Sequence, residues 1–449
     1  MHRSAPRGDQ ILPSAVLTGL GPANRRTAVS AGTLIVGASQ AGLQLAVSLR
    51  ELGDTSPITL IGEEPHAPYQ RPPLSKEFLS GTAGPESLAF RTPAFYADAG
   101  IELLRGERVT SLNLPGAGKA GSGVARTAAG RDLPFQRLAL TVGAGPRRLT
   151  VPGADLDGIC YLRDVDDAAE LGSRLAGASR VVVVGGGFIG LEAAAVARAR
   201  GKAVTVVEAA ERLVARAVAP VVSRFYRQAH QRRGTTVLLS TGVSGFSGEG
   251  GRVSRVLLTD GSELPADLVV VGIGVVPRTE LAQRAGLECD GGIVVDAYAR
   301  TSEPSVVAAG DCTLRPHPMT GVGRVRLESV QNAVAQAAVA AATLLGRLEE
   351  RKAVPWFWSD QGDLKLQIAG LSADYDNYVV RGEPDSERFS VLYYQGSRLL
   401  AVDAVNNPVD YMVVRKALSR GATIPADKAA VSTTPLKGLV IAGAEAAQG

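Results

Sequence analysis

The stretch RVVVVGGGFIGLEAAAVARARG at residues 180–201, followed by AVTVVEAAE at 203–211, decides the fold. Its valine run predicts a buried strand, its glycines a tight turn, and its alanine-rich segment a helix leading to a second strand. Gly185, Gly187 and Gly190 form a GxGxxG pattern. The first glycine permits the turn, the second lets the backbone approach a pyrophosphate, and the third packs helix on strand. Amides at the helix start would hold the phosphate charge, so this unit is predicted to bind a dinucleotide.

Glu208 ends the second strand, at the position where an acid accepts hydrogen bonds from an adenosine ribose. A carboxylate there would repel a 2′-phosphate, which predicts NADH rather than NADPH as the nucleotide. Arg212 and Arg216 follow closely, and as cations they would weaken this preference.

The same strand–turn–helix–strand pattern occurs earlier, in residues 33–64. Here the glycine positions hold Gly37, Ser39 and Gly42, so a Cβ stands where the pyrophosphate would approach, although serine is small enough to be tolerated. The expected ribose acid is Glu63, with Glu64 as the fallback.

Two units with different glycine patterns predict one tightly held nucleotide and one exchangeable nucleotide, which means a flavin beside a nicotinamide. The segment AAGDC around residue 310 agrees with this interpretation. A short strand would deliver Asp311 to a polyhydroxylated chain such as the flavin ribitol.

Composition limits the other possibilities. A chain of 449 residues is long enough for two or three domains, and 45% hydrophobic with 20% charged residues is a globular composition. No apolar run reaches the roughly 18–20 residues of a membrane helix, so no membrane association is expected. The formal net charge is +4, and most of it lies in the first 30 residues. Because the rest is nearly neutral, nucleic acid is not an expected partner.

The three cysteines, Cys160, Cys289 and Cys312, lie far apart and form no CxxC pair. Neither a dithiol redox centre nor a metal site is therefore predicted. A sparse, odd set of cysteines is typical of a reducing cytoplasm, which is the expected location.

Several longer strings resemble the bacterial NADH-dependent ferredoxin reductases of the putidaredoxin-reductase type, which belong to the glutathione-reductase-like flavoproteins with two dinucleotide sites. The strings are PYQRPPLSKEFLSG at 68–81, GGGFIGLE at 185–192, GDC at 310–312, RLESVQNA at 326–333 and PWFWSDQ at 355–361. The resemblance covers about residues 31–440. Ser39 and TVGAGPR at 141–147 depart from the family pattern, which affects the local loop geometry rather than the cofactor.

The expected fold class is α/β, with two Rossmann-like dinucleotide-binding domains and a C-terminal α+β module. Residues 1–30 mix Pro, Arg, Ser and Gly without periodicity and are expected to be a disordered extension. By the resemblance, the rest divides into a discontinuous FAD-binding domain at 31–150 and 275–346, an NADH-binding domain at 151–274, and a C-terminal reductase module at 351–440.

The resemblance implies catalytic roles for Lys76, Glu192 and Trp358. Lys76 would lie near the flavin N5, paired with Glu192, which would lie beside the nicotinamide. A glutamate in the first helical turn would also simply stabilise the helix dipole, so both interpretations stay open for Glu192. Trp356 and Trp358 are assigned to the face where the C-terminal module meets the flavin, with Trp358 closer, or alternatively to the module core.

Phe188 is either an aromatic flap over the nicotinamide or a packing residue. The full set of expected cofactor-binding residues is Gly37, Ser39, Gln40, Ala41, Gly42, Glu63, Arg71, Lys76, Ala144, Asp311, Val330, Trp358, Gly185, Gly187, Phe188, Ile189, Gly190, Glu208 and Gly274.

The implied activity is electron transfer from NADH through FAD to a [2Fe–2S] ferredoxin that serves a P450 or a ring-hydroxylating oxygenase. A flavin is required because nicotinamide gives electrons in pairs, whereas the cluster accepts one. Lys365, Arg415 and Lys416 are candidate docking cations, or else solvated surface charges. Two alternatives stay open: a reductase of rubredoxin, quinone or a small-molecule radical, and a redox-signalling flavoprotein similar to apoptosis-inducing factor.

Overall fold

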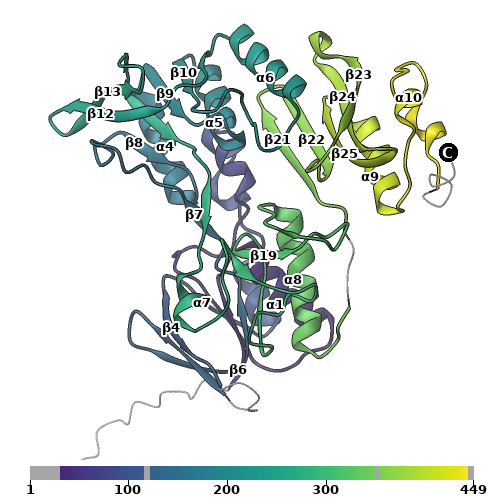
Figure 1. Cartoon of the computed structure of the whole chain (residues 1–449). Helices are drawn as coiled ribbons and strands as arrows, with labels where there is room; N and C mark the ends of the chain where they lie inside the picture. The colour runs from purple at the N-terminus through teal and green to yellow at the C-terminus, as the bar shows by residue number, and fades with distance from the viewer. Residues whose placement is uncertain (1–30, 116–121, 350–352, 443–449) are drawn as a thin grey trace, which may run out of the picture.

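A computed structural model describes residues 31–115, 122–349 and 353–442. The extension at 1–30, predicted to be disordered, lies outside the described residues. Figure 1 shows three parts, two α/β units and a C-terminal module, in agreement with the predicted fold class.

The first unit is a seven-stranded sheet with the order β3-β2-β1-β6-β5-β4, and β18 pairs with β6. The strands next to β1 are parallel, whereas β4, β5 and β6 form an antiparallel meander. Helices α1 and α8 pack against each other on this sheet. The elements are β1 (Gly32–Val36), α1 (Gln40–Glu51), β2 (Ile58–Ile61), β3 (Ile101–Leu104), β4 (Val109–Asn113), β5 (Gly123–Thr127), β6 (Asp132–Leu140), β18 (Val306–Ala308) and α8 (Val330–Leu344).

The second unit is a five-stranded, fully parallel sheet with the order β11-β10-β9-β15-β8. Parallel sheets bury both faces, which explains the unbroken valine run of β9. The elements are β8 (Ile159–Tyr161), α4 (Val165–Gly177), β9 (Arg180–Val184), α5 (Phe188–Ala199), β10 (Ala203–Val207), α6 (Pro220–Arg232), β11 (Thr236–Leu238) and β15 (Leu268–Val271).

The chain crosses between these units on two antiparallel strands, β7 (Ala144–Pro146) and β16 (Val275–Pro277), so that β18 returns to the first sheet. Two small sheets accompany this path. The smaller elements are β12 (Val243–Glu249), β13 (Arg252–Leu258), β14 (Glu263–Pro265), β17 (Ile293–Val294), β19 (Thr313–Pro316), β20 (Arg324–Val325), η1 (Pro72–Ser75), α2 (Glu77–Ser80), η2 (Pro85–Ser87), α3 (Pro93–Asp98) and α7 (Glu280–Arg284).

The C-terminal module is a five-stranded antiparallel sheet with the order β21-β22-β25-β24-β23, covered by α9. Its elements are β21 (Trp356–Gln361), β22 (Leu364–Gly370), β23 (Asn377–Glu383), η3 (Pro384–Ser386), β24 (Arg388–Gln395), β25 (Arg398–Val405), α9 (Pro408–Ser419), α10 (Ala426–Ala429) and η4 (Leu436–Leu439). None of the helices in the described ranges is long and apolar enough to cross a membrane.

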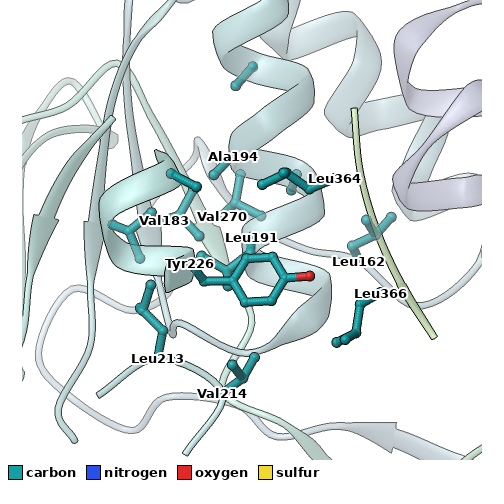
Figure 2. Packing of buried hydrophobic residues seen from close by; sticks show 14 of the residues in the cluster. Leu162, Val183, Leu191, Ala194, Leu213, Val214, Tyr226, Val270, Leu364 and Leu366 are labelled. Carbon is teal, nitrogen blue, oxygen red and sulfur yellow. The ribbon is translucent and has the colours of Figure 1, made fainter. Parts of the chain in front are cut away.

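One hydrophobic cluster joins the module to the second unit. Leu191 and Tyr226, from α5 and α6, pack with Leu364 and Leu366 of β22 (Figure 2). Since this cluster is continuous across both parts, the edge strand β21 is held against α5.

Candidate functional site

The first glycine turn lies at the carboxyl end of β1. Gly37 has a φ of +118°, and a Cβ on Gly42 would lie 2.0 Å from the Gly37 carbonyl oxygen. Ser39 is the N-cap of α1, but its side chain makes no capping hydrogen bond, and the first turn, which includes Gln40 and Ala41, holds no acid. The backbone amides at this helix start are therefore suited to an anion such as a pyrophosphate.

The second glycine turn repeats this geometry at the end of β9. A Cβ on Gly185 would lie 2.4 Å from the Gly272 carbonyl oxygen, and one on Gly190 would lie 2.2 Å from that of Gly185. Gly187, the N-cap of α5, differs, because the nearest atom to its Cβ would be 3.9 Å away. Gly185 and Gly190 are needed by the fold itself, whereas the fold has room for a Cβ at Gly187, which suggests a close approach to a ligand instead.

Glu208 follows β10 and lies against the second glycine turn. Its Oε2 accepts a hydrogen bond from the Gly186 amide at 2.6 Å, and its Oε1 accepts one from the Ala210 amide at 2.7 Å. The Arg212 guanidinium donates to the carbonyls of Val218 and Ala215. Because Arg212 is occupied in this way, it is not directed toward a 2′-phosphate.

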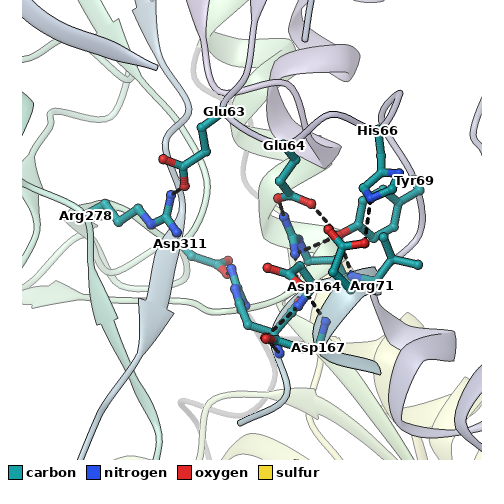
Figure 3. Close-up of polar contacts among 12 residues, drawn as sticks. Glu63, Glu64, His66, Tyr69, Arg71, Asp164, Asp167, Arg278 and Asp311 are labelled. Carbon is teal, nitrogen blue, oxygen red and sulfur yellow. Dashed lines mark hydrogen bonds and ion pairs between the residues drawn. The ribbon is translucent and has the colours of Figure 1, made fainter. Parts of the chain in front are cut away.

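The two acids after β2 have different partners (Figure 3). Glu64 accepts from Arg71 and from the Tyr69 hydroxyl, the latter at 2.5 Å. Glu63 instead forms an ion pair with Arg278, from the segment after β16. Both acids are thus paired with an arginine, so Glu63 as the ribose acid, with Glu64 as the fallback, stays a prediction. Arg71 also donates to the Arg163 carbonyl at 2.7 Å, and its contact with FAD stays a prediction.

Asp311 lies directly after β18, as the sequence predicts. The preceding Gly310 has a φ of +87°, and its amide donates to Gln336 Oε1 of α8 at 2.9 Å. Arg163 donates to Asp311 Oδ2 at 3.2 Å, and burial lowers the pKa of this arginine. The carboxylate is therefore held at the carboxyl edge of the first sheet, where ligands of such folds bind.

A buried ion pair joins the two units. Lys76 Nζ donates to Glu192 Oε2 at 2.9 Å, although the two residues are far apart in the sequence. The Ser75 hydroxyl donates to the same oxygen at 2.5 Å, and the Ser359 hydroxyl of the C-terminal module donates to Oε1 at 2.6 Å. Three donors from two other parts of the chain thus converge on one carboxylate that is 3% exposed.

The placement of Glu192 in the first helical turn is wrong. Glu192 is the fifth residue of α5, and the first turn of this helix contains no acid. Stabilisation of the helix dipole does not explain it, because that effect falls off within the first turn. Phe188 does open the helix, and its ring lies 4.8 Å from the ring of Phe357. Phe188 therefore packs against the C-terminal module, and its role as a flap over the nicotinamide stays a prediction.

The two tryptophans of β21 have different surroundings. Trp356 packs on the module core, and the Arg415 guanidinium lies 4.9 Å above its ring. The Trp358 ring stacks on Trp356 with the centroids 5.5 Å apart. Trp358 is half-buried and outside that core cluster, which favours it as the tryptophan that contacts a ligand.

The remaining predicted cofactor residues lie at edges of the two units. Ile189 is a large apolar residue that is 41% exposed at the start of α5. Gly274, with a φ of +98°, lies between β15 and β16, beside the Arg216 guanidinium. Ala144 begins β7, and Val330 is the first residue of α8.

Of the three candidate docking cations, the structure brings only Arg415 and Lys416 together. Arg415 lies over Trp356, and Lys416 is an exposed neighbour on α9. Lys365 is exposed too, but it lies away from these residues. Its register partner in the sheet is Asp360, near the far end of β21 from Trp356.

Sequence reasoning missed Arg163, Ser75, Ser359 and Arg278. Ser75 and Ser359 lie inside strings that were singled out, next to Lys76 and Trp358, but serine is common at turns and in strands. Arg163 follows strand β8 at the same sheet edge as other site residues, which was a usable signal.

The thiols take no part in this site. Cys160, Cys289 and Cys312 are free, and burial raises the pKa of Cys312 to about 12. No group of three or more His, Cys, Asp or Glu residues within the described ranges could hold a metal ion.

Comparisons with known proteins agree with this geometry. The family described as pyridine nucleotide-disulphide oxidoreductase matches residues 32–337, and the family described as reductase C-terminal matches residues 356–440. Rhodocoxin reductase from Rhodococcus erythropolis is 46% identical over 90% of this chain and 93% of its own length.

Two solved structures are similar along nearly the whole chain. One is the ferredoxin reductase for the CYP199A2 system from Rhodopseudomonas palustris, with a TM-score of 0.86, 42% identity, and coverage of 91% of this chain and 99% of that one. The other is the covalent putidaredoxin reductase–putidaredoxin complex, with a TM-score of 0.87, 39% identity, and coverage of 92% and 98%.

Proposed function

Because the chain belongs to the pyridine nucleotide-disulphide oxidoreductase family, we propose that it carries electrons from NADH through FAD to a [2Fe–2S] ferredoxin. The predicted family, enzyme class and use of FAD with NAD(P)H are confirmed. One observation supports the acceptor above all. The chain resembles reductases of small electron-transfer proteins along nine-tenths of its length, including the C-terminal module.

We assign FAD to the first unit and NADH to the second, with the domain division predicted from the sequence. The uncapped helix α1, Glu63 and Asp311 are suited to the pyrophosphate, ribose and ribitol of FAD. The uncapped helix α5, Gly187 and Glu208 are suited to those of NADH.

FAD, when bound, accepts two electrons from the nicotinamide and releases them one at a time. Lys76 would place a positive charge beside the flavin ring and so offset the negative charge that reduction adds. Glu192 holds the ammonium at 2.9 Å and keeps this buried site electrically balanced.

The same residues support NADH over NADPH. Glu208 already accepts two backbone hydrogen bonds and would meet a 2′-phosphate with a negative charge. Arg212, the nearer cation in sequence, is tied to backbone carbonyls instead.

The acceptor is tested directly with purified proteins. We expect NADH to reduce a [2Fe–2S] ferredoxin from an oxygenase system much faster than it reduces rubredoxin, a quinone or a small-molecule radical. Ferredoxin reduction no faster than background, with fast rubredoxin or quinone reduction, would replace the proposed acceptor. Slow oxidation by every protein acceptor, with a long-lived charge-transfer complex, would favour the signalling alternative.

For docking, we propose that the ferredoxin approaches the surface of Trp356, Trp358, Arg415 and Lys416, where Arg415 lies over one ring of an aromatic pair and Lys416 is exposed beside Arg415 on α9. Lys416→Glu should raise the KM for ferredoxin several-fold at low salt without changing reduction of a small dye. Lys428→Glu on α10 is the matched control, and equal effects of the two variants would remove this surface. A ferredoxin that serves a P450 or ring-hydroxylating oxygenase, and a location in the cytoplasm, stay predictions.

A further inference from the structure

One face of strand β21 carries a line of buried polar groups toward α5 and α6. Side chains alternate along a strand, so Phe357, Ser359 and Gln361 share the face opposite Trp356 and Trp358. The Phe357 ring meets Phe188 of α5, and Ser359 meets Glu192 one helical turn further along. Ser359 is fully buried and Gln361 nearly so, as is His230 at the end of α6.

These polar groups form a chain of hydrogen bonds with one direction. His230 Nε2 lies 2.8 Å from Gln361 Oε1, and an amide oxygen can only accept, so the histidine donates. Gln361 Nε2 donates to the Ser359 hydroxyl at 3.4 Å, and this hydroxyl donates to Glu192 Oε1 at 2.6 Å. Every donor therefore points toward the Glu192 carboxylate.

His230, the first donor of this hydrogen-bond series, is suited to donating without adding a charge. Burial lowers the pKa of His230, which keeps the imidazole neutral, with its Nε2–H used by Gln361. Arg233, the C-cap of α6, is the charged residue near His230. Its guanidinium is paired with Asp363 and Glu387 of the module. The neutral histidine thus adds no charge that would compete with Lys76 for Glu192.

The two oxygens of Glu192 are held from opposite sides. Oε2 takes Lys76 and Ser75 from the first unit, whereas within the described part of the chain the donor to Oε1 is Ser359 of the C-terminal module. Without the Ser359 hydroxyl, a buried carboxylate oxygen would lose its partner, which is costly enough to turn the side chain.

We propose that Ser359, Gln361 and His230 are positioning residues that fix the orientation of the Glu192 carboxylate toward Lys76. This inference rests on the proposed function, in which the Lys76–Glu192 pair lies beside the two cofactors. The C-terminal module would then serve hydride transfer as well as acceptor docking, because its edge strand completes the ion pair.

The test compares Ser359→Ala with Ser390→Ala. Ser390 is also a fully buried serine of the module sheet, but its hydroxyl accepts a hydrogen bond from Asn407 and is not part of the series that leads to Glu192. In acceptor-free stopped-flow reduction of the FAD-loaded protein by NADH, Ser359→Ala should lower the limiting rate about tenfold. It should change the Kd for NADH less than twofold, and Ser390→Ala should match the wild type.

A purely structural role is separated by a double-mutant cycle and by a readout without activity. In a Glu192→Gln background, Ser359→Ala should cause no further loss of rate, because its effect passes through the carboxylate. A crystal structure of cofactor-free Ser359→Ala should show this carboxylate turned from Lys76. Additive losses, or an unmoved carboxylate, would overturn the proposal.

Gln361→Met gives a second variant should Ser359→Ala fail to fold. It keeps the serine hydroxyl but removes the donor behind it, so the loss of limiting rate should be in the same direction and smaller. A wild-type rate in this variant would remove Gln361 and His230 from the proposal. Since no ferredoxin is present, these results are independent of which acceptor the protein uses.

Discussion

Glu208 is the residue on which the choice between NADH and NADPH depends. Glu208→Ala should relax this preference about tenfold in the ratio of the two kcat/KM values, because a like charge near the 2′-phosphate is removed. Both nucleotides should bind more weakly, since the Gly186 amide loses its acceptor, so the ratio is the informative readout. Glu249→Ala, at an exposed strand end of the same unit, is the control. An unchanged ratio would withdraw the ribose assignment.

Asp403 gives the protein a pH-dependent stability. This carboxyl of β25 is fully buried, and burial raises its pKa to about 7. A raised pKa in the folded state means that the protonated form stabilises the fold, fully below pH ~4 and decreasingly up to about pH 7. The contribution of Asp403 to the free energy of unfolding should fall by about 3 kcal/mol between pH 5 and pH 8.

The measurement is urea unfolding of the wild type and of Asp403→Asn at these two pH values. The neutral asparagine cannot ionise, so the wild type should lose more stability than the variant as the pH rises. Parallel losses would show that Asp403 titrates in the folded protein as it does in the unfolded chain.

At the scale of elements, the two glycines of the second turn should respond differently to the same substitution. Gly190→Ala pushes α5 away from β9, since its Cβ would lie 2.2 Å from the Gly185 carbonyl oxygen, and should cost at least about 2 kcal/mol. Gly187→Ala makes only an ordinary van der Waals contact, at 3.9 Å from the Gly272 carbonyl oxygen, and should melt like the wild type, but bind NAD⁺ at least tenfold more weakly. Thermal melting and calorimetric titration check both. Normal binding by Gly187→Ala would mean that no pyrophosphate passes there.

Elements that depend on local sequence patterns could be predicted from the sequence. Glycine spacing, strand alternation and helix length are local, so both βαβ units could be predicted. Helix α5 was also predicted, yet the position of Glu192 in its second turn was misjudged. A one-turn error of this kind is small in the sequence, but it decides whether the helix dipole can explain the residue.

Contacts between distant elements were beyond local patterns. Nothing in the sequence near Glu192 indicates Ser359, because the β21 register that joins them is fixed by the packing of Leu364 and Leu366 on the second unit. The family resemblance supplied the Lys76–Glu192 pair. It did not supply the serines around it or the Arg163–Asp311 contact.

At the scale of the whole molecule, two buried tyrosines lie at the interface between the second unit and the C-terminal module, and their hydroxyls differ in hydrogen bonding. The Tyr393 hydroxyl accepts from the Ala219 amide of the second unit at 2.8 Å and donates to Asp403. The Tyr226 hydroxyl is buried too, but has no hydrogen-bond partner among the described residues. One hydroxyl therefore links two parts of the molecule, while the other is buried without such a link.

Tyr393→Phe should lower the free energy of unfolding by about 2–3 kcal/mol, because it leaves a buried amide and a buried carboxyl without their partner. Tyr226→Phe should be neutral or stabilising by up to about 1–2 kcal/mol, because it removes a buried polar group that makes no protein contact. Urea unfolding near pH 6, where Asp403 is mostly protonated, measures both changes with the same ring kept in place. Hydrogen exchange of the Ala219 amide adds a local readout, and it should become faster in Tyr393→Phe alone. If both variants were equally destabilised, the module would be held by aromatic packing, and the Tyr393 hydrogen bonds would add nothing to the interface.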